Sequence, residues 1–270
     1  MSGSAEGVGR ATGLSGVVGA AAPWFAAEAL VFDRYWDSSS RSLDSDLGWL
    51  RRQAYKELVD GALARIASVD AGLDHASDPH VRQRLQDDLV EAAEELDHFG
   101  RFADAHEQLG GGRVEVSALR ADGNWEANES LRRVRARHAE THPIVGRLAA
   151  TFTEGGCSTL YAAGAARAGH GPEDDVIAAA CSAVFADEIR HMRGALADVP
   201  AGWTESDWKL LASLVVEQCR ARVDMRDEQF GHPLTRADRA LIETGRIEPI
   251  AEVSTRFGLD ADQGTATISA

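Results

Sequence analysis

The spacing of apolar residues is the feature that most constrains the fold of this chain. Long stretches rich in Ala, Leu, Arg and Glu carry apolar side chains three and four positions apart, whereas the alternating β-branched pattern of strands is almost absent. Such spacing gives an α-helix one apolar face that can pack against other helices. The sequence therefore predicts an all-α fold.

Capping residues, prolines and glycines divide the chain into its expected helices. Pro79 and Pro172 lie where a helix can begin, and the three glycines at 110–112 can end one. The expected helices cover about 24–36, 47–69, 79–109, 128–138, 144–163, 172–196, 204–229 and 235–244. Residues 23–255 are then a single helical domain, which the glycine-rich residues 1–22 and the polar residues 256–270 flank as flexible tails.

Charge and composition exclude several classes of partner. The chain has 43 acidic against 28 basic residues and a formal net charge of −15, which argues against nucleic acid and anionic membrane surfaces as partners. An uninterrupted apolar run of the length that spans a bilayer is also missing, so no membrane segment is expected. Three separated cysteines suit reduced thiols, and the expected location is the cytoplasm.

The pattern Glu-x-x-His occurs twice, each time on a segment expected to be helical. Glu95 and His98 form the first pair, and Glu188 and His191 form the second. Residues three apart lie on the same helical face, so each pair can offer a carboxylate and an imidazole to one point. Each pair therefore looks like one half of a site for two metal ions.

A complete site of this kind needs one more carboxylate for each half. Glu154 lies within an otherwise apolar helix, where an uncompensated carboxylate is costly to bury and so calls for a reason. Glu57 occupies the corresponding place on the helix before Glu95, although Asp60 is a rival for that role and a solvated face is the alternative explanation. The predicted ligand order is Glu57, Glu95, His98, Glu154, Glu188 and His191.

Another carboxylate directly precedes each motif glutamate. Glu94 and Asp187 hold these positions, four residues before His98 and His191 respectively. A metal-bound imidazole needs an acceptor for its second N–H group, and a carboxylate from a neighbouring helix can serve. The hypothesis is that Asp187 orients His98 and that Glu94 orients His191.

The residues that follow Glu154 suggest a pocket. Gly155 and Gly156 each cost about 1 kcal/mol relative to alanine inside a helix, which points to a use. We expect them to leave space beside the metals, or to form a bulge that redirects Glu154. Cys157 and Tyr161 lie on the same side of the helix and are expected to line that space, although a buried packing role is the plainer explanation for the cysteine.

One carboxylate per helix alternating with Glu-x-x-His resembles the ferritin-like superfamily of di-iron and di-manganese carboxylate proteins. The resemblance covers about residues 43–197, and its second half is similar to bacterial di-iron oxygenases such as the arylamine N-oxygenases. It implies a ferritin-like four-helix bundle with additional helices, those after the bundle covering about 203–255. It also implies metals bridged by carboxylates, with Glu95 and Glu188 as the bridging ligands.

The function implied by this resemblance is that of a non-haem di-metal oxidase or oxygenase. Two iron ions, or one iron and one manganese, would activate dioxygen to oxidise a small organic substrate such as an amine or an acid. Four carboxylates would balance two divalent ions, so the reduced site could lie inside an apolar bundle. A reductase or ferredoxin electron donor and a homodimer are the expected partners. The alternative is a ferritin-type ferroxidase that handles iron without an organic substrate.

Overall fold

A computed structural model describes residues 3–194, 199–248 and 250 of the 270. Every regular element among these residues is a helix, so the predicted all-α class is confirmed. The expected C-terminal tail at 256–270 lies outside the described residues. The described residues cluster into two compact units. Of these, the first unit contains residues 3–38, 126–163, 188–194, 199–248 and 250, and the second contains residues 39–125 and 164–187.

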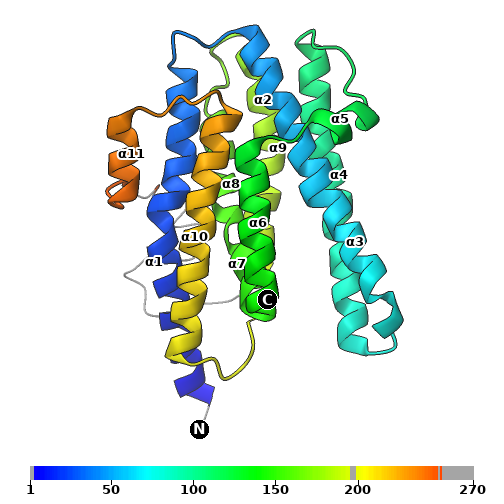
Figure 1. The fold of residues 1–270 in the computed structure, drawn as a ribbon, viewed down its shortest axis with the longest axis vertical. Coiled ribbons are helices and arrows are strands. Elements are labelled where there is room, and N and C mark those ends of the chain that lie inside the picture. Colours follow the sequence, from blue (N-terminus) through cyan, green and yellow to red (C-terminus); the bar gives the residue numbers. More distant parts are fainter. Residues whose placement is uncertain (1–2, 195–198, 249, 251–270) are drawn as a thin grey trace. The chain divides into compact units, whose positions relative to one another are not determined.

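The first unit is built on two long helices that pack along each other, α1 and α10 (Figure 1). α6 and α7 also pack against α10, and α11 contacts α1. The carboxylate of Glu228, near the end of α10, accepts a hydrogen bond from the backbone N–H of Ala127 in the first turn of α6. The helices of this unit are α1 (Gly3–Trp36), α6 (Glu126–Thr141), α7 (Pro143–Phe152), most of α8 (Glu154–Ala165), α10 (Glu205–Gln229) and α11 (Arg236–Glu243).

The flexible tail expected over residues 1–22 is wrong from Gly3 onward, because α1 begins there. Its glycines weaken the helix locally, but tertiary packing outweighs that cost. Gly13 lies so close to Trp208 of α10 that a Cβ atom at this position would be 2.3 Å from the indole ring. Val17, Val18 and Ala21 are buried. The small residues therefore permit close helix packing.

One segment of α1, Thr12–Trp36, is long and apolar enough to cross a membrane by length and composition alone. The sequence analysis expected no such segment because it considered only uninterrupted apolar runs. Thr12–Trp36 is interrupted by charged residues and still has a mean hydropathy of 1.5. About 56% of its apolar window is buried in the structure, and its Glu28 forms buried ion pairs with Arg222 and Arg226 of α10. A buried core helix passes the same test of length and composition, so the segment is weak evidence for a membrane location.

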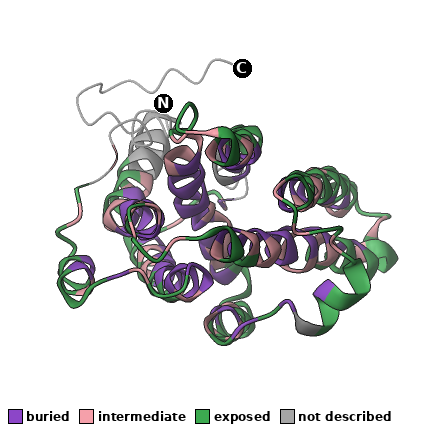
Figure 2. Cartoon of the chain, turned by 90° about the horizontal axis from the view of Figure 1, so that it is seen from above, coloured by how far each residue is buried: buried purple, intermediate pink, exposed green. Residues whose placement is uncertain are grey.

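The second unit is centred on the 30-residue helix α4, which packs against α2, η1 and α3. Ser42 forms a capping box at the start of α2, and Asp78 caps α4 directly before Pro79. Helices in both units show buried and exposed sides (Figure 2). The elements of this unit are α2 (Leu43–Tyr55), η1 (Lys56–Ala62), α3 (Leu63–Gly72), η2 (Leu73–His75), α4 (Pro79–Gln108), α5 (Val116–Asp122) and the first part of α9 (Pro172–Gly194).

Two predicted helices are interrupted. The helix expected over 47–69 is α2 and α3 joined by η1, which is a π-helix from Lys56 to Ala62. Such wide turns are rare and recur at functional sites. The helix expected over 144–163 is divided at Thr153 into α7 and α8. The bounds of α4, in contrast, agree with the predicted 79–109 to within one residue.

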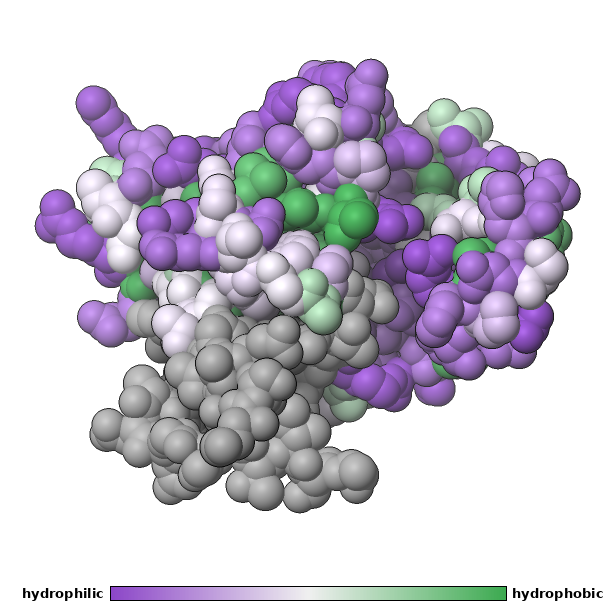
Figure 3. Space-filling view, turned by 90° about the horizontal axis from the view of Figure 1, so that it is seen from below, coloured by the Kyte–Doolittle hydropathy of each residue, from purple (hydrophilic) through white to green (hydrophobic). Residues whose placement is uncertain are grey.

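The surface agrees with the acidic composition. Hydrophilic residues predominate on the described part of the face seen from below (Figure 3). All three cysteines are free and buried, as expected for reduced thiols.

Candidate metal-binding clusters

The second unit brings together three of the predicted ligands. Glu57 comes from η1, and Glu95 and His98 come from the buried side of α4. One carboxylate oxygen or ring nitrogen of each lies within 4.8 Å of those of the other two. All three side chains are buried. Ala92, Glu95, His98 and Phe102 follow one another at intervals of three or four residues, so they lie on the same face of α4, and all four are buried.

The structure distinguishes the two first-helix candidates, Glu57 and Asp60. Glu57 Oε1 accepts a hydrogen bond from Gln53 Nε2 at 2.5 Å, one helical turn earlier, and Glu57 belongs to the cluster. Asp60 instead accepts from Lys56 Nζ at 2.8 Å in a nearly buried ion pair. The geometry therefore places Glu57, and not Asp60, among the possible ligands.

His98 lies between two carboxylates of the second unit. Its Nε2 is 3.1 Å from Asp187 Oδ2 on α9, and its Nδ1 is 3.7 Å from Glu95 Oε2. A proton on Nε2 can therefore be donated to Asp187, while Nδ1 faces the cluster. This is the contact that the sequence predicts for Asp187.

Burial and neighbouring charges shift the pKa values of Glu95 and His98. Burial and the nearby Glu57 carboxylate together raise the pKa of Glu95 to about 7, against the lowering effect of His98. Burial alone would lower the pKa of His98, but the neighbouring carboxylates of Glu95, Glu57 and Asp187 raise it to about 9. Two buried carboxylates beside an imidazole form a donor set that suits a divalent cation. The residues present therefore fit a metal ion.

These pKa values predict how the stability of the metal-free protein depends on pH. Both pKa values are raised, so the folded state holds extra protons, and their stabilising effect is fully present below about pH 4.5 for Glu95 and pH 6.5 for His98. It is lost as the pH rises through about 7 and about 9. In EDTA, the unfolding free energy of the wild type relative to that of Glu95→Gln should fall from pH 5 to pH 9, because only the wild type loses a stabilising proton at this position, as measured by urea denaturation. A difference that does not vary with pH would contradict this prediction.

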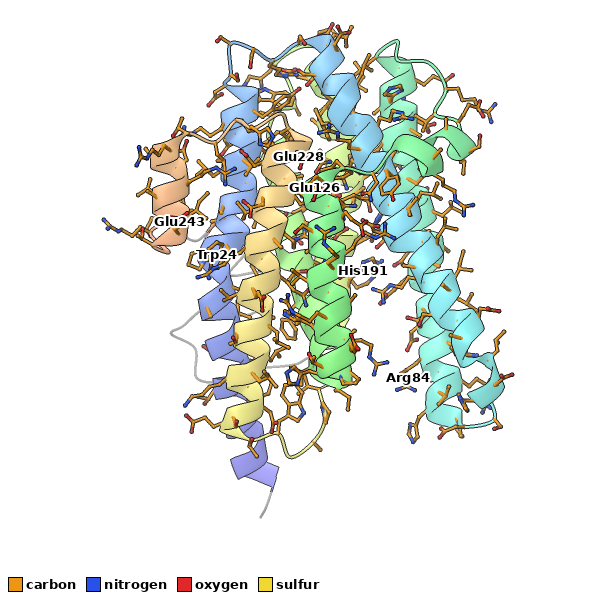
Figure 4. All side chains as sticks on the ribbon, viewed as in Figure 1. Trp24, Arg84, Glu126, His191, Glu228 and Glu243 are labelled. Carbon is orange, nitrogen blue, oxygen red and sulfur yellow. The ribbon has the colours of Figure 1, made fainter. Side chains whose placement is uncertain are left out.

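The first unit holds the other three predicted ligands. Glu154 is the first residue of α8, and Glu188 and His191 lie three apart on α9, where Figure 4 labels His191. One oxygen or nitrogen of each lies within 4.8 Å of those of the other two. Glu188 and His191 are buried, and Glu154 is half-buried. This set has the same composition as that of the second unit, two carboxylates and one imidazole.

Gly155 and Gly156 face α1. A Cβ atom on Gly155 would lie 2.6 Å from the ring of Phe25, and one on Gly156 would lie 2.0 Å from a carboxylate oxygen of Glu28. The pair therefore allows α1 to approach the first turn of α8. The pocket that the sequence places beside these glycines is occupied, at these two positions, by side chains of α1.

Cys157 also contacts charged residues that the sequence analysis did not consider. Its Sγ accepts from Arg222 Nη2 at 2.8 Å and lies 3.5 Å from Arg226 Nη2. Tyr161 is fully buried in the same unit. Glu28, which pairs with both arginines, gave a signal in the sequence: it is the one charged residue in the apolar run from Ala20 to Phe32.

The expected contact of Glu94 with His191 stays a prediction.

A groove in the first unit lies apart from the candidate ligands and contains none of the predicted site residues. Its lining includes Trp24 and Glu243 (Figure 4), with Arg220 stacked over the Trp24 ring at 5.0 Å.

No family model, curated protein or solved structure matches this chain.

Proposed function

We propose that the two ligand sets form one dinuclear metal centre and that the protein is an oxidase or oxygenase. The metals would be two iron ions, or one iron and one manganese, and the substrate a small organic molecule such as an amine or an acid. One observation carries the proposal: each compact unit brings together its own set of one glutamate and one Glu-x-x-His pair, and five of these six side chains are buried. Buried carboxylates without such a purpose are costly.

The connectivity of the chain supports joining the two sets. Asp187 contacts His98 in the second unit, and the next residue along the chain, Glu188, belongs to the ligand set of the first unit. A single peptide bond therefore links a residue that orients one imidazole to a ligand of the other set. In a ferritin-like bundle, Glu-x-x-His motifs on two helices and a glutamate on each of two others supply such a centre.

Charge balance also supports two divalent ions. The four carboxylates carry four negative charges, and two divalent cations would neutralise them in a buried site. Iron suits a mixed set of carboxylates and imidazoles. When bound, such a reduced metal pair would supply electrons to dioxygen and so activate it as the oxidant.

The chain's own residues would hold and orient this centre. Gln53 Nε2 donates a hydrogen bond to Glu57 Oε1 and would help to orient that carboxylate. Asp187 accepts the Nε2 proton of His98, so that Nδ1 is the nitrogen available to a cation. Burial of Glu95, His98, Glu188 and His191 excludes bulk water from both sets.

The test is metal analysis of the full chain after anaerobic loading with Fe(II). We expect about two metal ions per chain, with loss of metal in Glu154→Ala/His191→Ala and in Glu57→Ala/His98→Ala. His170→Ala, which removes an exposed histidine in a turn, is the control and should keep both ions. Metal at background level in the wild type, or metal unaffected by the double variants, would refute the proposal.

Exposure of the loaded protein to dioxygen separates the proposed enzyme from an iron-handling protein. An oxygenase should consume dioxygen in proportion to an added amine or acid when a ferredoxin or flavin reductase supplies electrons. Oxidation of many Fe(II) ions per chain with no dependence on an organic substrate would instead support the ferroxidase alternative.

A further inference from the structure

The interior of the first unit contains a charged network that no ligand role explains. Arg222 donates from Nε and Nη2 to the two carboxylate oxygens of Glu28 at 2.7 and 2.9 Å. Arg226 Nε donates to the same carboxylate at 3.1 Å. The exposed fractions of Glu28, Arg222 and Arg226 are 1%, 2% and 0%. Guanidinium groups buried this deeply have fixed positions, because each N–H group needs an acceptor.

This network reaches the helix that begins with Glu154. Arg222 Nη2 also donates to the sulfur of Cys157, which lies three residues after Glu154 in the first turn of α8. The missing side chain of Gly156 admits the Glu28 carboxylate. Thr159 anchors the next turn through a hydrogen bond from its hydroxyl to the backbone carbonyl of Phe25. Three successive parts of α8 are therefore held by α1 and α10.

The start of α8 needs such support. A turn at Thr153 separates α8 from α7, so α8 does not simply continue the preceding helix. Glu154 is the first residue after that break. Residues three apart share a helical face, so Cys157 and Glu154 lie on the same side of this first turn.

We propose that Arg222 and Glu28 are positioning residues for the Glu154 carboxylate and that they act through the sulfur of Cys157. The inference rests on the proposed metal centre, because positioning Glu154 matters only if Glu154 is a ligand. Replacing a residue that hydrogen-bonds to a metal ligand and orients it typically weakens metal binding about 10-fold to 100-fold. Cys157 is the member of the network that can be changed without leaving a buried charge unpaired.

The experiment compares Cys157→Ala and Cys157→Ser with Cys219→Ala. Cys219 is a matched control, since it is free and buried in the same unit and no hydrogen bond joins it to an arginine among the described residues. Affinity is measured by titrating the metal-free full chain with Co²⁺ and following visible absorption, and stability by thermal unfolding in EDTA. Cys157→Val, which fills more of the space but accepts no hydrogen bond, replaces the alanine variant if that variant is poorly folded.

We expect Cys157→Ala to bind Co²⁺ about 10-fold more weakly or worse and to change the visible absorption band. Cys157→Ser should retain most of the affinity, because its hydroxyl oxygen can accept from Arg222. Cys219→Ala should lose a similar amount of stability and bind Co²⁺ as the wild type does. A serine variant as weak as alanine, or an alanine variant as tight as Cys219→Ala, overturns the inference and leaves the metal centre intact. A wild type that binds no Co²⁺ overturns both.

Discussion

Replacing Glu28 with alanine is expected to lower the free energy of unfolding by about 3–5 kcal/mol. Glu28 is the carboxylate that accepts hydrogen bonds from both Arg222 and Arg226. Although burial opposes its ionisation, the charges of the two arginines lower the pKa of Glu28. Its removal leaves two buried guanidinium groups without this counter-charge, and such a loss costs more than the ion pair itself contributes.

Urea denaturation followed by circular dichroism measures this effect. The control is Asp224→Ala, which removes one of the two carboxylates paired with Arg239; the side chains of this pair are 63% and 42% exposed, and Arg239 keeps its ion pair with Asp227. An exposed pair of that kind contributes between about 0 and 1 kcal/mol. The two variants should therefore differ by several-fold in their loss of stability. If Glu28→Ala loses no more than the control does, the buried network is not an important source of stability.

Replacing Gly61 with alanine is expected to abolish or strongly weaken metal binding with little loss of stability. Gly61 lies in η1, and a Cβ atom there would be 2.5 Å from Glu95 Oε2 and 2.9 Å from its carboxyl carbon. The end of the Glu95 side chain can move away at low cost, but it then leaves the position that it shares with Glu57 and His98. Displacing a ligand by an ångström is enough to disrupt a metal site.

Gly48→Ala is the matched control for this prediction. Gly48 lies in α2, and a Cβ atom there would meet nothing within 4 Å. Alanine at this position should stabilise the helix by up to about 1 kcal/mol and leave metal binding unchanged. Metal content after Fe(II) loading and thermal unfolding in EDTA are measured for both variants. Wild-type metal content in Gly61→Ala would argue against Glu95 as a ligand.

Much of the candidate site could be predicted because its signals are local. Glu95 and His98 lie three apart within α4, whose start at Pro79 and end near Gly110 are both marked in the sequence. Periodicity then places them on the face that also buries Ala92. Glu57 could not be separated from Asp60 in this way, because the π-helix changes which residues share a face.

The buried network could not be predicted in the same way. Glu28 and Arg222 are 194 positions apart, and no local pattern connects them. The sequence gives only partial signals: Glu28 is a carboxylate in an apolar run, and Arg222 and Arg226 are four positions apart on α10. The glycines after Glu154 were likewise interpreted as space for a ligand, whereas they receive Phe25 and Glu28 of α1.

The sequence by itself determined the helical class and the bounds of α4, because hydrogen bonding within a helix and apolar periodicity depend on residues a few positions apart. It also pointed to Glu95, His98, Glu154, Glu188 and His191 as candidate ligands. Only the tertiary structure decided that residues from Gly3 onward form a helix, that η1 brings Glu57 to Glu95, and that Cys157 accepts from Arg222. These outcomes depend on which helices dock. Docking balances the packing of distant side chains against local propensity, and that balance cannot be evaluated within a short window of sequence.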